Sequence, residues 1–200
     1  MTKTLLMVGI GMAGMVFLDS ATRLGVDVHG IELPDRKPGY VDRISAFTDC
    51  RGLVDELWAE AAETAVRNSR PDGVLAFYES HVMAAALVQE RLGLPGPSLR
   101  AATISRNKAL QRAVFAAAAI RQPDYLVAED IRDARDWAAR RLPVFIKPLS
   151  LTGGAGVQYI IDEQDLDAAI QRRTGTGKLL VETEAAGPGT AGSRWWSTVK

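Results

Sequence analysis

Residues 143–159 read PVFIKPLSLTGGAGVQY and place a lysine and a glycine-rich loop between two short apolar runs. Residues 144–146 have the β-branched and aromatic character of a buried strand, so Lys147 emerges near the end of that strand. The glycines at 153, 154 and 156 permit positive φ angles, which let successive backbone N–H groups converge on an anion beside the lysine charge. This stretch predicts a phosphate-binding hairpin, and an ordinary hairpin with a glycine turn is the alternative.

The composition indicates a globular protein with small-molecule partners. The 200 residues are 47% hydrophobic and 24% charged, which suits one or two packed domains. With 24 basic and 24 acidic residues the formal net charge is zero, so no diffuse positive field would gather nucleic acid or an anionic membrane. Cys50 is the only cysteine, which excludes an intramolecular disulfide and a multi-cysteine metal site and suits a reducing cytoplasm. No segment is long enough to span a membrane.

The start of the chain carries a rival signal. A strand is expected at 4–8, then the turn GIGMAG, a helix to residue 24 and a second strand at 26–33. Gly9, Gly11 and Gly14 match the G-x-G-x-x-G pattern, and Glu32 follows at about the spacing of the ribose-binding acid in dinucleotide-binding domains. An NAD-dependent oxidoreductase is therefore one alternative function. The structural explanation of the same glycines is close packing at a tight strand-to-helix turn.

The remaining pattern predicts an α/β protein. Further helices are expected at 53–68, 79–92, 105–120, 130–141 and 162–173, and further strands at 73–77, 124–128, 144–146, 157–161 and 178–181. The strand–helix alternation up to residue 92 predicts a parallel, Rossmann-like sheet, because parallel strands need crossover connections. Two paired strands, a helix and a strand then predict a β-β-α-β lid. We expect a first domain over residues 1–95, a second over 96–188 and a tail over 189–200.

The order and spacing of several blocks resemble the ATP-grasp superfamily of carboxylate-amine ligases, and among these the amino-acid ligases. PDGVLAFYESH (71–81) and AAALVQERLGLPGPS (84–98) are similar to the end of the family's preceding α/β domain. SRNKALQRAVFAAA (105–118) is similar to the helix of its first lysine, and VFIKPLSLTGGAGV (144–157) to its second-lysine strand and glycine-rich loop. LLVETEAAGP (179–188) is similar to its adenine hinge. The resemblance runs to about residue 187 and implies a Rossmann-like domain followed by part of an ATP-grasp domain.

The resemblance implies an ATP site. It places two lysines on the phosphates, the glycine-rich loop over them, a carboxylate opposite the adenine amino group and hinge backbone groups at the adenine edge. The implied cofactor-binding residues are Lys108, Lys147, Gly153, Gly154, Ala155, Gly156, Glu182, Thr183 and Ala185. Lysines and loop amides neutralise phosphate charge, and a carboxylate accepts from an amino group. The implied chemistry phosphorylates a substrate carboxylate, and an amine then displaces phosphate from the acyl phosphate.

The resemblance also implies magnesium, small-molecule carboxylate and amine substrates, and a homodimer as a further expectation. Where the family hinge continues with an acid for the ribose, this chain has Gly189, and no remaining segment resembles the family's magnesium-binding acids or its phosphate-contacting arginine. We therefore expect an ATP-binding fragment of a ligase, truncated before the catalytic half, with no metal ligand or catalytic residue assigned. A non-catalytic nucleotide-binding module is the second alternative.

The last residues predict a shift of reading frame after about Pro188. GTAGSRWWSTVK places two adjacent tryptophans in a segment with no strand or helix period. Because tryptophan has a single codon, Trp195 and Trp196 fix six nucleotides, and suitable codons around them give VEVVVDGE in the adjacent frame. That peptide is an apolar strand entering an Asp-Gly turn, which is similar to what the family carries after its hinge. A natural short chain with a disordered tail is the alternative.

Overall fold

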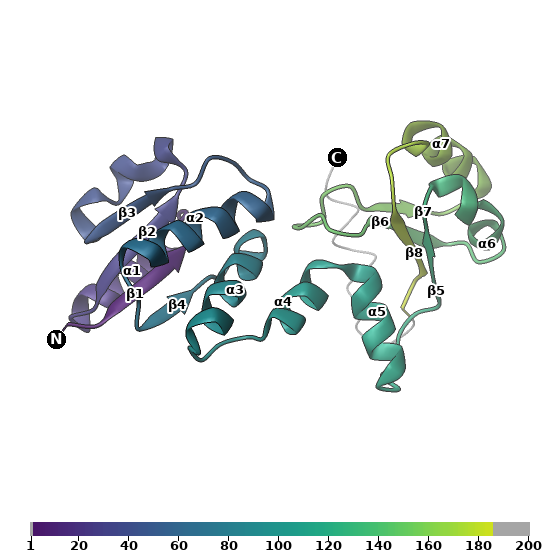
Figure 1. Ribbon diagram of the computed structural model, residues 1–200. Coiled ribbons are helices and arrows are strands. Elements are labelled where there is room, and N and C mark those ends of the chain that lie inside the picture. The colour runs from purple at the N-terminus through teal and green to yellow at the C-terminus, as the bar shows by residue number, and fades with distance from the viewer. Residues whose placement is uncertain (1, 186–200) are drawn as a thin grey trace. The chain divides into compact units, whose positions relative to one another are not determined.

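The computed structural model describes residues 2–185 and divides into two compact units, the first ending at Ser105 and the second beginning at Arg106 (Figure 1). The first unit contains the strands β1 (Thr4–Val8), β2 (Asp27–Glu32), β3 (Ala46–Asp49) and β4 (Gly73–Leu75). Its helices are α1 (Met15–Arg23), α2 (Asp55–Asn68) and α3 (Val82–Leu92), and α4 (Leu99–Arg106) follows them. Short 3-10 helices lie at Pro34–Gly39, Val41–Arg43 and Glu79–His81. The predicted tail and its frame shift lie outside the described residues.

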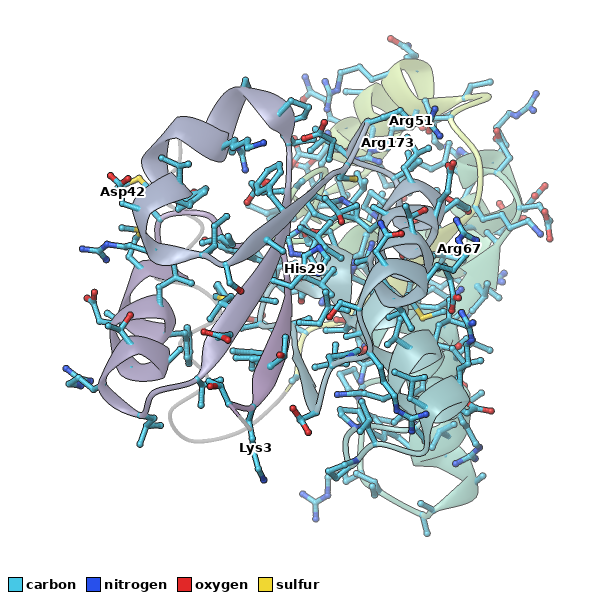
Figure 2. The ribbon with its side chains drawn as sticks, turned by 60° about the vertical axis from the view of Figure 1, so that its left-hand side comes forward. Lys3, His29, Asp42, Arg51, Arg67 and Arg173 are labelled. Atoms are coloured by element: carbon cyan, nitrogen blue, oxygen red, sulfur yellow. The ribbon has the colours of Figure 1, made fainter. Side chains whose placement is uncertain are left out.

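A parallel sheet with the strand order β3-β2-β1-β4 forms the centre of the first unit. Its two faces bury separate apolar clusters, because successive side chains of β1 point to opposite sides. Leu6 and Val8 pack with Trp58 of α2 and with α3, whereas Met7 packs with Leu18 of α1. Helices therefore cover both faces. Lys3, just before β1, is exposed, and His29 of β2 is buried, where its Nε2 lies 2.8 Å from Thr48 Oγ1 (Figure 2).

The second unit is built on an antiparallel sheet with the order β5-β8-β6-β7. Its strands are β5 (Tyr125–Ala128), β6 (Val144–Pro148), β7 (Gln158–Ile160) and β8 (Leu179–Thr183). Its helices are α5 (Lys108–Ala117), α6 (Arg135–Ala139) after a 3-10 turn at Ile131–Ala134, and α7 (Glu163–Arg173). Alternate residues of the strands, including Val144, Ile146 and Val181, pack against Ala138 and Leu166 of these helices. One face of the sheet is thus a core face, and the other carries the polar side chains described below.

The structure confirms the predicted fold class, a parallel sheet followed by paired strands with a helix, and corrects several elements. β3 was not predicted, because its four residues are only half-buried or exposed and include Thr48 and Asp49. The single helix expected at 105–120 is wrong: α4 and α5 are separated by Asn107, whose extended backbone interrupts the helix. Between the second expected strand and the next expected helix, Pro34–Gly39 forms a 3-10 helix. Among residues 2–185, no helix is both long and apolar enough to cross a membrane.

Candidate functional site

The polar face of the second sheet aligns one residue from each of its four strands. The pairing puts Glu182 beside both Phe145 and Tyr125, and Phe145 beside Tyr159. Residues that pair directly across neighbouring strands point to the same face, so these four side chains form a row from β5 to β7. Lys147 lies on the same face, two residues after Phe145. The row is opposite the core face, because Val144 and Ile146 alternate with these residues.

Glu182 is the buried charge of this face, with 3% of its surface exposed. Lys147 donates through Nζ to Glu182 Oε1. Arg112 of α5 donates to Glu182 Oε2 through Nε at 3.1 Å and through Nη2 at 2.5 Å. A buried carboxylate needs such partners, since taking it out of water without a counter-charge costs several kcal/mol. Each oxygen of Glu182 is therefore held by its own cation.

Aromatic rings extend the row beside this ion-pair cluster. The rings of Phe145 and Tyr159 lie 4.6 Å apart between centroids, and Lys147 Nζ lies 5.2 Å from the Phe145 centroid. Tyr159 donates its hydroxyl to Glu184 Oε2 at 3.1 Å. Burial raises the pKa of the Tyr159 phenol, and the Glu184 carboxylate raises it further. An apolar ring surface beside a carboxylate and two cations suits a planar ligand that also carries negative charge.

The glycine-rich loop has the backbone conformation that its sequence predicts. Gly153, Gly154 and Gly156 have φ angles of 60°, 77° and 70°, which side-chain-bearing residues rarely adopt. Within the loop, Ala155 N–H donates to Thr152 O at 3.0 Å and Val157 N–H donates to Gly154 O at 3.1 Å. The loop is thus a defined turn, partly held by its own backbone hydrogen bonds.

Lys108 reaches the segment that leads into this loop. Its Nζ donates to Leu151 O at 2.7 Å, and its backbone N–H donates to Leu149 O at 3.0 Å. The Asn107 side chain caps α5 by accepting from Ala109 N–H at 2.9 Å and Leu110 N–H at 3.1 Å. The helix start therefore fixes Lys108 beside the loop, and its role in phosphate binding stays a prediction.

The predicted hinge residues after Glu182 are Thr183 and Ala185. Thr183 N–H donates to Asp124 O at 2.9 Å, just before β5, so this amide already has a partner. Ala185 is exposed. Contact of either residue with an adenine edge stays a prediction.

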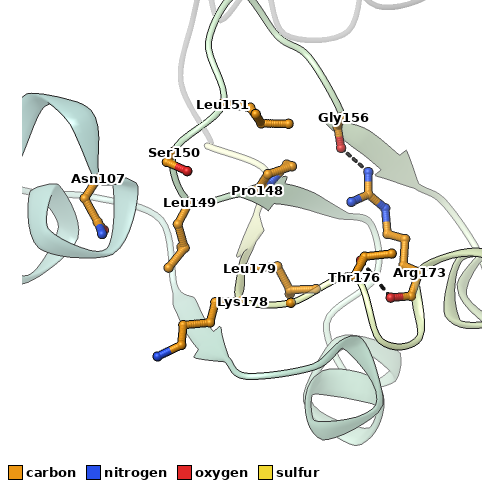
Figure 3. Close-up of a pocket in the computed structure, with 11 residues that line it drawn as sticks. Asn107, Pro148, Leu149, Ser150, Leu151, Gly156, Arg173, Thr176, Lys178 and Leu179 are labelled. Carbon is orange, nitrogen blue, oxygen red and sulfur yellow. Dashed lines mark hydrogen bonds between the residues drawn. The ribbon is translucent and has the colours of Figure 1, made fainter. Parts of the chain in front are cut away.

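A cavity of about 560 Å³ lies beside the loop, between the end of β6 and the segment after α7 (Figure 3). Arg173 closes one side, donating through Nε to Gln158 Oε1 at 2.8 Å and through Nη2 to Gly156 O. Burial lowers the pKa of the Arg173 guanidinium, and the neighbouring Arg172 lowers it further. Lys147 and Glu182 do not line this cavity. Arg173 therefore fastens the end of the glycine-rich loop without touching the ion-pair cluster.

Arg112, Arg173 and Asn107 are site residues that the sequence interpretation did not assign. One signal pointed to Arg112: it follows Lys108 by four residues, and that spacing places two helical side chains on one face. Arg173 carried no such signal, because it ends a helix with another arginine beside it, which is also the ordinary pattern of a helix terminus.

In the first unit, the GIGMAG turn is held by Glu32, the acid that the dinucleotide-binding alternative assigned to a ribose. Glu32 is 1% exposed, and its Oε2 accepts from the N–H groups of Ile10 at 3.0 Å and Gly11 at 2.9 Å. In a dinucleotide site the loop amides face the pyrophosphate and the acid faces the ribose. Here the amides and the acid bind each other. The nicotinamide-cofactor alternative is therefore not favoured, and the structural explanation of the glycines holds.

A second cavity of about 650 Å³ opens beside this turn, lined in part by Tyr40, Trp58, Tyr78 and His81. Burial lowers the pKa of His81 to about 4, against the opposing effect of Glu32. Among residues 2–185, no group lies within hydrogen-bonding geometry of the buried Trp58 Nε1 and His81 Nδ1. The cavity follows the carboxyl ends of parallel strands, which is where open α/β sheets bind ligands. The nearby Cys50 is buried, and burial raises its pKa, so it has the character of a structural thiol.

Magnesium finds no group of protein ligands in the part of the chain that the structure describes. Among residues 2–185, no cluster of three or more His, Cys, Asp or Glu side chains is arranged to hold a metal ion. The carboxylate of the site, Glu182, is engaged by two cations. These residues therefore do not fit a protein-held magnesium ion.

Among curated proteins, the chain is similar to formate-dependent phosphoribosylglycinamide formyltransferase of Chlorobaculum tepidum. The two are 27% identical over 172 residues, which cover 84% of this chain and 43% of that enzyme. The chain spans less than half the length of the curated relatives it matches. No family model matches the sequence.

Solved structures share the fold over nearly the whole chain. An L-amino acid ligase from Bacillus licheniformis superposes with a TM-score of 0.75 at 21% identity, covering 94% of this chain and 45% of that protein. A second match is the biotin carboxylase domain dimer of the Hydrogenobacter thermophilus 2-oxoglutarate carboxylase, solved with MgADP, ADP and bicarbonate. It superposes with a TM-score of 0.71 at 18% identity, covering 92% of this chain and 44% of that protein. The resemblance indicated by the sequence blocks is thereby confirmed as a shared fold, and the shared part is the amino-terminal part of those enzymes.

Proposed function

We propose that this chain, a homologue of the ATP-grasp ligases, binds ATP on the polar face of its second sheet. The observation that carries the proposal is the cluster of Lys147, Glu182 and Arg112 beside the Phe145 ring, on a sheet whose glycine-rich loop follows the lysine strand. A carboxylate that accepts from an amino group, an apolar ring surface and a lysine at a loop with positive φ angles are the parts that a purine nucleotide needs.

In this proposal Lys147 and Lys108 meet the phosphates, and the loop from Gly153 to Gly156 closes over them. Glu182 accepts from the adenine amino group, and backbone groups of Thr183 and Ala185 contact the adenine edge. Lys108 is already at the loop entrance, where its Nζ holds Leu151 O. If the Lys108 ammonium group exchanged that carbonyl for a phosphate oxygen, its positive charge would lie against the ligand.

The proposed reaction of the whole ligase is phosphorylation of a carboxylate to an acyl phosphate and attack by an amine. Magnesium, when bound, would neutralise phosphate charge, but the described residues do not supply its ligands, and the roles proposed here involve only this chain's own side chains. The second cavity, beside Glu32, is our proposed place for a small-molecule substrate. Assembly as a homodimer and a cytoplasmic location stay predictions.

Thermal denaturation of the intact chain with and without ATP tests the binding proposal. A ligand that binds only the folded state raises the unfolding free energy by about 2.7 kcal/mol at a concentration 100 times its Kd. We expect ATP to raise the midpoint of the wild type and of Lys3→Ala, a matched control in which the lysine is exposed, just before β1 in the first unit. Lys147→Ala should lose the ATP-dependent rise. An equal rise in all three proteins would overturn the proposed site.

Release of ADP distinguishes the ligase from a nucleotide-binding module. A module would show ATP-dependent stabilisation without ADP release in the presence of magnesium and a carboxylate library. A ligase activity would release ADP and form a hydroxylamine-trappable acyl phosphate.

A further inference from the structure

Lys147 has two competing partners in the proposed site. In this structure its Nζ donates to Glu182 Oε1, whereas ATP binding requires the same ammonium group to move to a phosphate. Glu182 is only 3% exposed. If Lys147 moved away, Glu182 Oε1 would lose its bonding partner inside the protein. A buried carboxylate stripped of all its cations is strongly unfavourable. Something else must therefore neutralise Glu182 when Lys147 leaves.

Arg112 is placed to do this. Two of its nitrogens, Nε and Nη2, point at the same oxygen, Glu182 Oε2, at 3.1 Å and 2.5 Å. Its side chain is 20% exposed, so water competes only weakly for the pair. The guanidinium brings two donors to this one oxygen, whereas an ammonium group in its place would contact it as a single point charge.

We propose that Arg112 is a positioning residue that holds Glu182 as a paired carboxylate, so that Lys147 is released to a nucleotide phosphate and Oε1 is freed to accept from an exocyclic amino group. This inference rests on the proposed function. It names the ligand class more narrowly, as a nucleotide whose base donates through an amino group and whose phosphate attracts Lys147.

In this proposal, the contact of Glu182 with the base and the contact of Lys147 with the phosphates depend on each other. Without Arg112, Lys147 is the only cation bonded to Glu182 in the described structure and should stay there. The triphosphate then loses its lysine contact, while adenosine, which has no phosphate, never used it. Loss of Arg112 should therefore weaken ATP binding by about tenfold, the size of one charge-assisted hydrogen bond, and adenosine binding by less than about threefold.

Calorimetric titration of the intact chain with ATP and with adenosine tests this. The variants are Arg112→Met, Arg112→Gln, Arg112→Lys and Lys147→Met, together with the double variant Arg112→Met/Lys147→Met. Arg140→Met is the control, because it removes an exposed arginine from the same unit. The measured quantity is the ratio of the adenosine Kd to the ATP Kd, which general destabilisation of the fold would leave unchanged. If Arg112→Met does not fold, the same titrations with Arg112→Gln test the proposal.

We expect Arg112→Met and Arg112→Gln to lower this ratio and Arg140→Met to leave it unchanged. Arg112→Lys should lower the ratio by less than Arg112→Met, because it keeps the charge beside Glu182 but only one point of contact. In the Lys147→Met background, Arg112→Met should lower it no further, because Arg112 acts through Lys147. Wild-type ATP binding with an unchanged ratio in Arg112→Met and Arg112→Gln would overturn the inference and leave the proposed function standing. Absence of ATP binding by the wild type would overturn the proposed function itself, and the inference with it.

Discussion

The backbone N–H of Gly11 donates to the carboxylate of Glu32 at 2.9 Å, so the acid at the end of β2 closes the glycine turn after β1. Three other donors, the Ile10 and Leu33 amides and the Arg36 guanidinium, share that carboxylate. The glycines of this turn thus allow backbone N–H groups to bind Glu32. This arrangement leads to the first three predictions below, all of which concern the stability of the first unit.

Glu32→Gln should destabilise the protein by about 1–3 kcal/mol, because an amide offers one acceptor oxygen where the carboxylate has two and places an N–H donor among backbone donors. Urea denaturation measures the difference. Glu60→Gln is the control, since Glu60 is about half exposed and pairs with Arg51 at the surface. Equal effects of the two substitutions would contradict the role given to Glu32.

Gly9→Ala should be far more destabilising than Gly25→Ala. Both glycines have positive φ, 72° and 64°, so both substitutions carry backbone strain of about 1–2 kcal/mol. Only at Gly9 would the added Cβ meet another group, the His81 ring at 1.9 Å, whereas nothing lies within 4 Å at Gly25. The difference between the two midpoints in thermal denaturation isolates the packing cost. Similar midpoints would show that His81 moves away freely.

The stability of the first unit should fall as the pH drops from about 6.5 towards 4. His81 has its pKa lowered from 6.5 to about 4 in the folded state by burial, although the nearby Glu32 and Asp55 act in the opposite direction. On acidification, His81 of the unfolded chain takes up a proton near pH 6.5, whereas His81 of the folded protein does so only near pH 4. The free energy of unfolding therefore falls between these two pH values, by an amount on the order of 3 kcal/mol. His81→Gln should flatten this part of the unfolding free energy measured against pH. A variant with the same slope as the wild type would assign the effect to other groups.

Asn107→Ala should weaken both the fold and nucleotide binding. The substitution removes the cap of α5, which costs about 0.5–2 kcal/mol, and loosens the helix that carries Lys108 and Arg112. Asn107→Asp keeps an acceptor at the cap and serves as the matched control. Helix content from circular dichroism and ATP affinity from calorimetry should fall together in the alanine variant alone. A loss of helix content with unchanged ATP affinity would separate α5 from the site.

Much of the fold was predictable because its signals are local. The apolar run 144–146, the glycines of the loop and the strand–helix alternation predict the sheets directly, and the structure confirms the fold class. β3 escaped prediction because a short strand with little burial has no period to detect. Asn107 was enclosed in a continuous helix because apolar spacing runs on both sides of it, although asparagine favours caps.

The candidate site was predictable only in part, because ion pairs join residues that are distant in sequence. Lys147 was assigned from the strand and glycine-loop pattern and Glu182 by resemblance, but their contact spans 35 residues and depends on the register of β6 and β8. The bond between Arg112 and Glu182 spans 70 residues and depends on the placement of α5. At GIGMAG the sequence left a cofactor site and close backbone packing as alternatives, and the bonds from Ile10 and Gly11 to Glu32 favour the second.

The most direct measurement of the central claim is a titration of the intact, isotope-labelled chain with ATP, followed by two-dimensional amide NMR. If ATP binds the polar face of the second sheet, the amides at 145–147, 153–156 and 182 should shift together with a single Kd, and Lys147→Ala should abolish those shifts. Shifts confined to the amides at 9–14 and 32, or shifts at the second sheet that persist unchanged in Lys147→Ala, would contradict it.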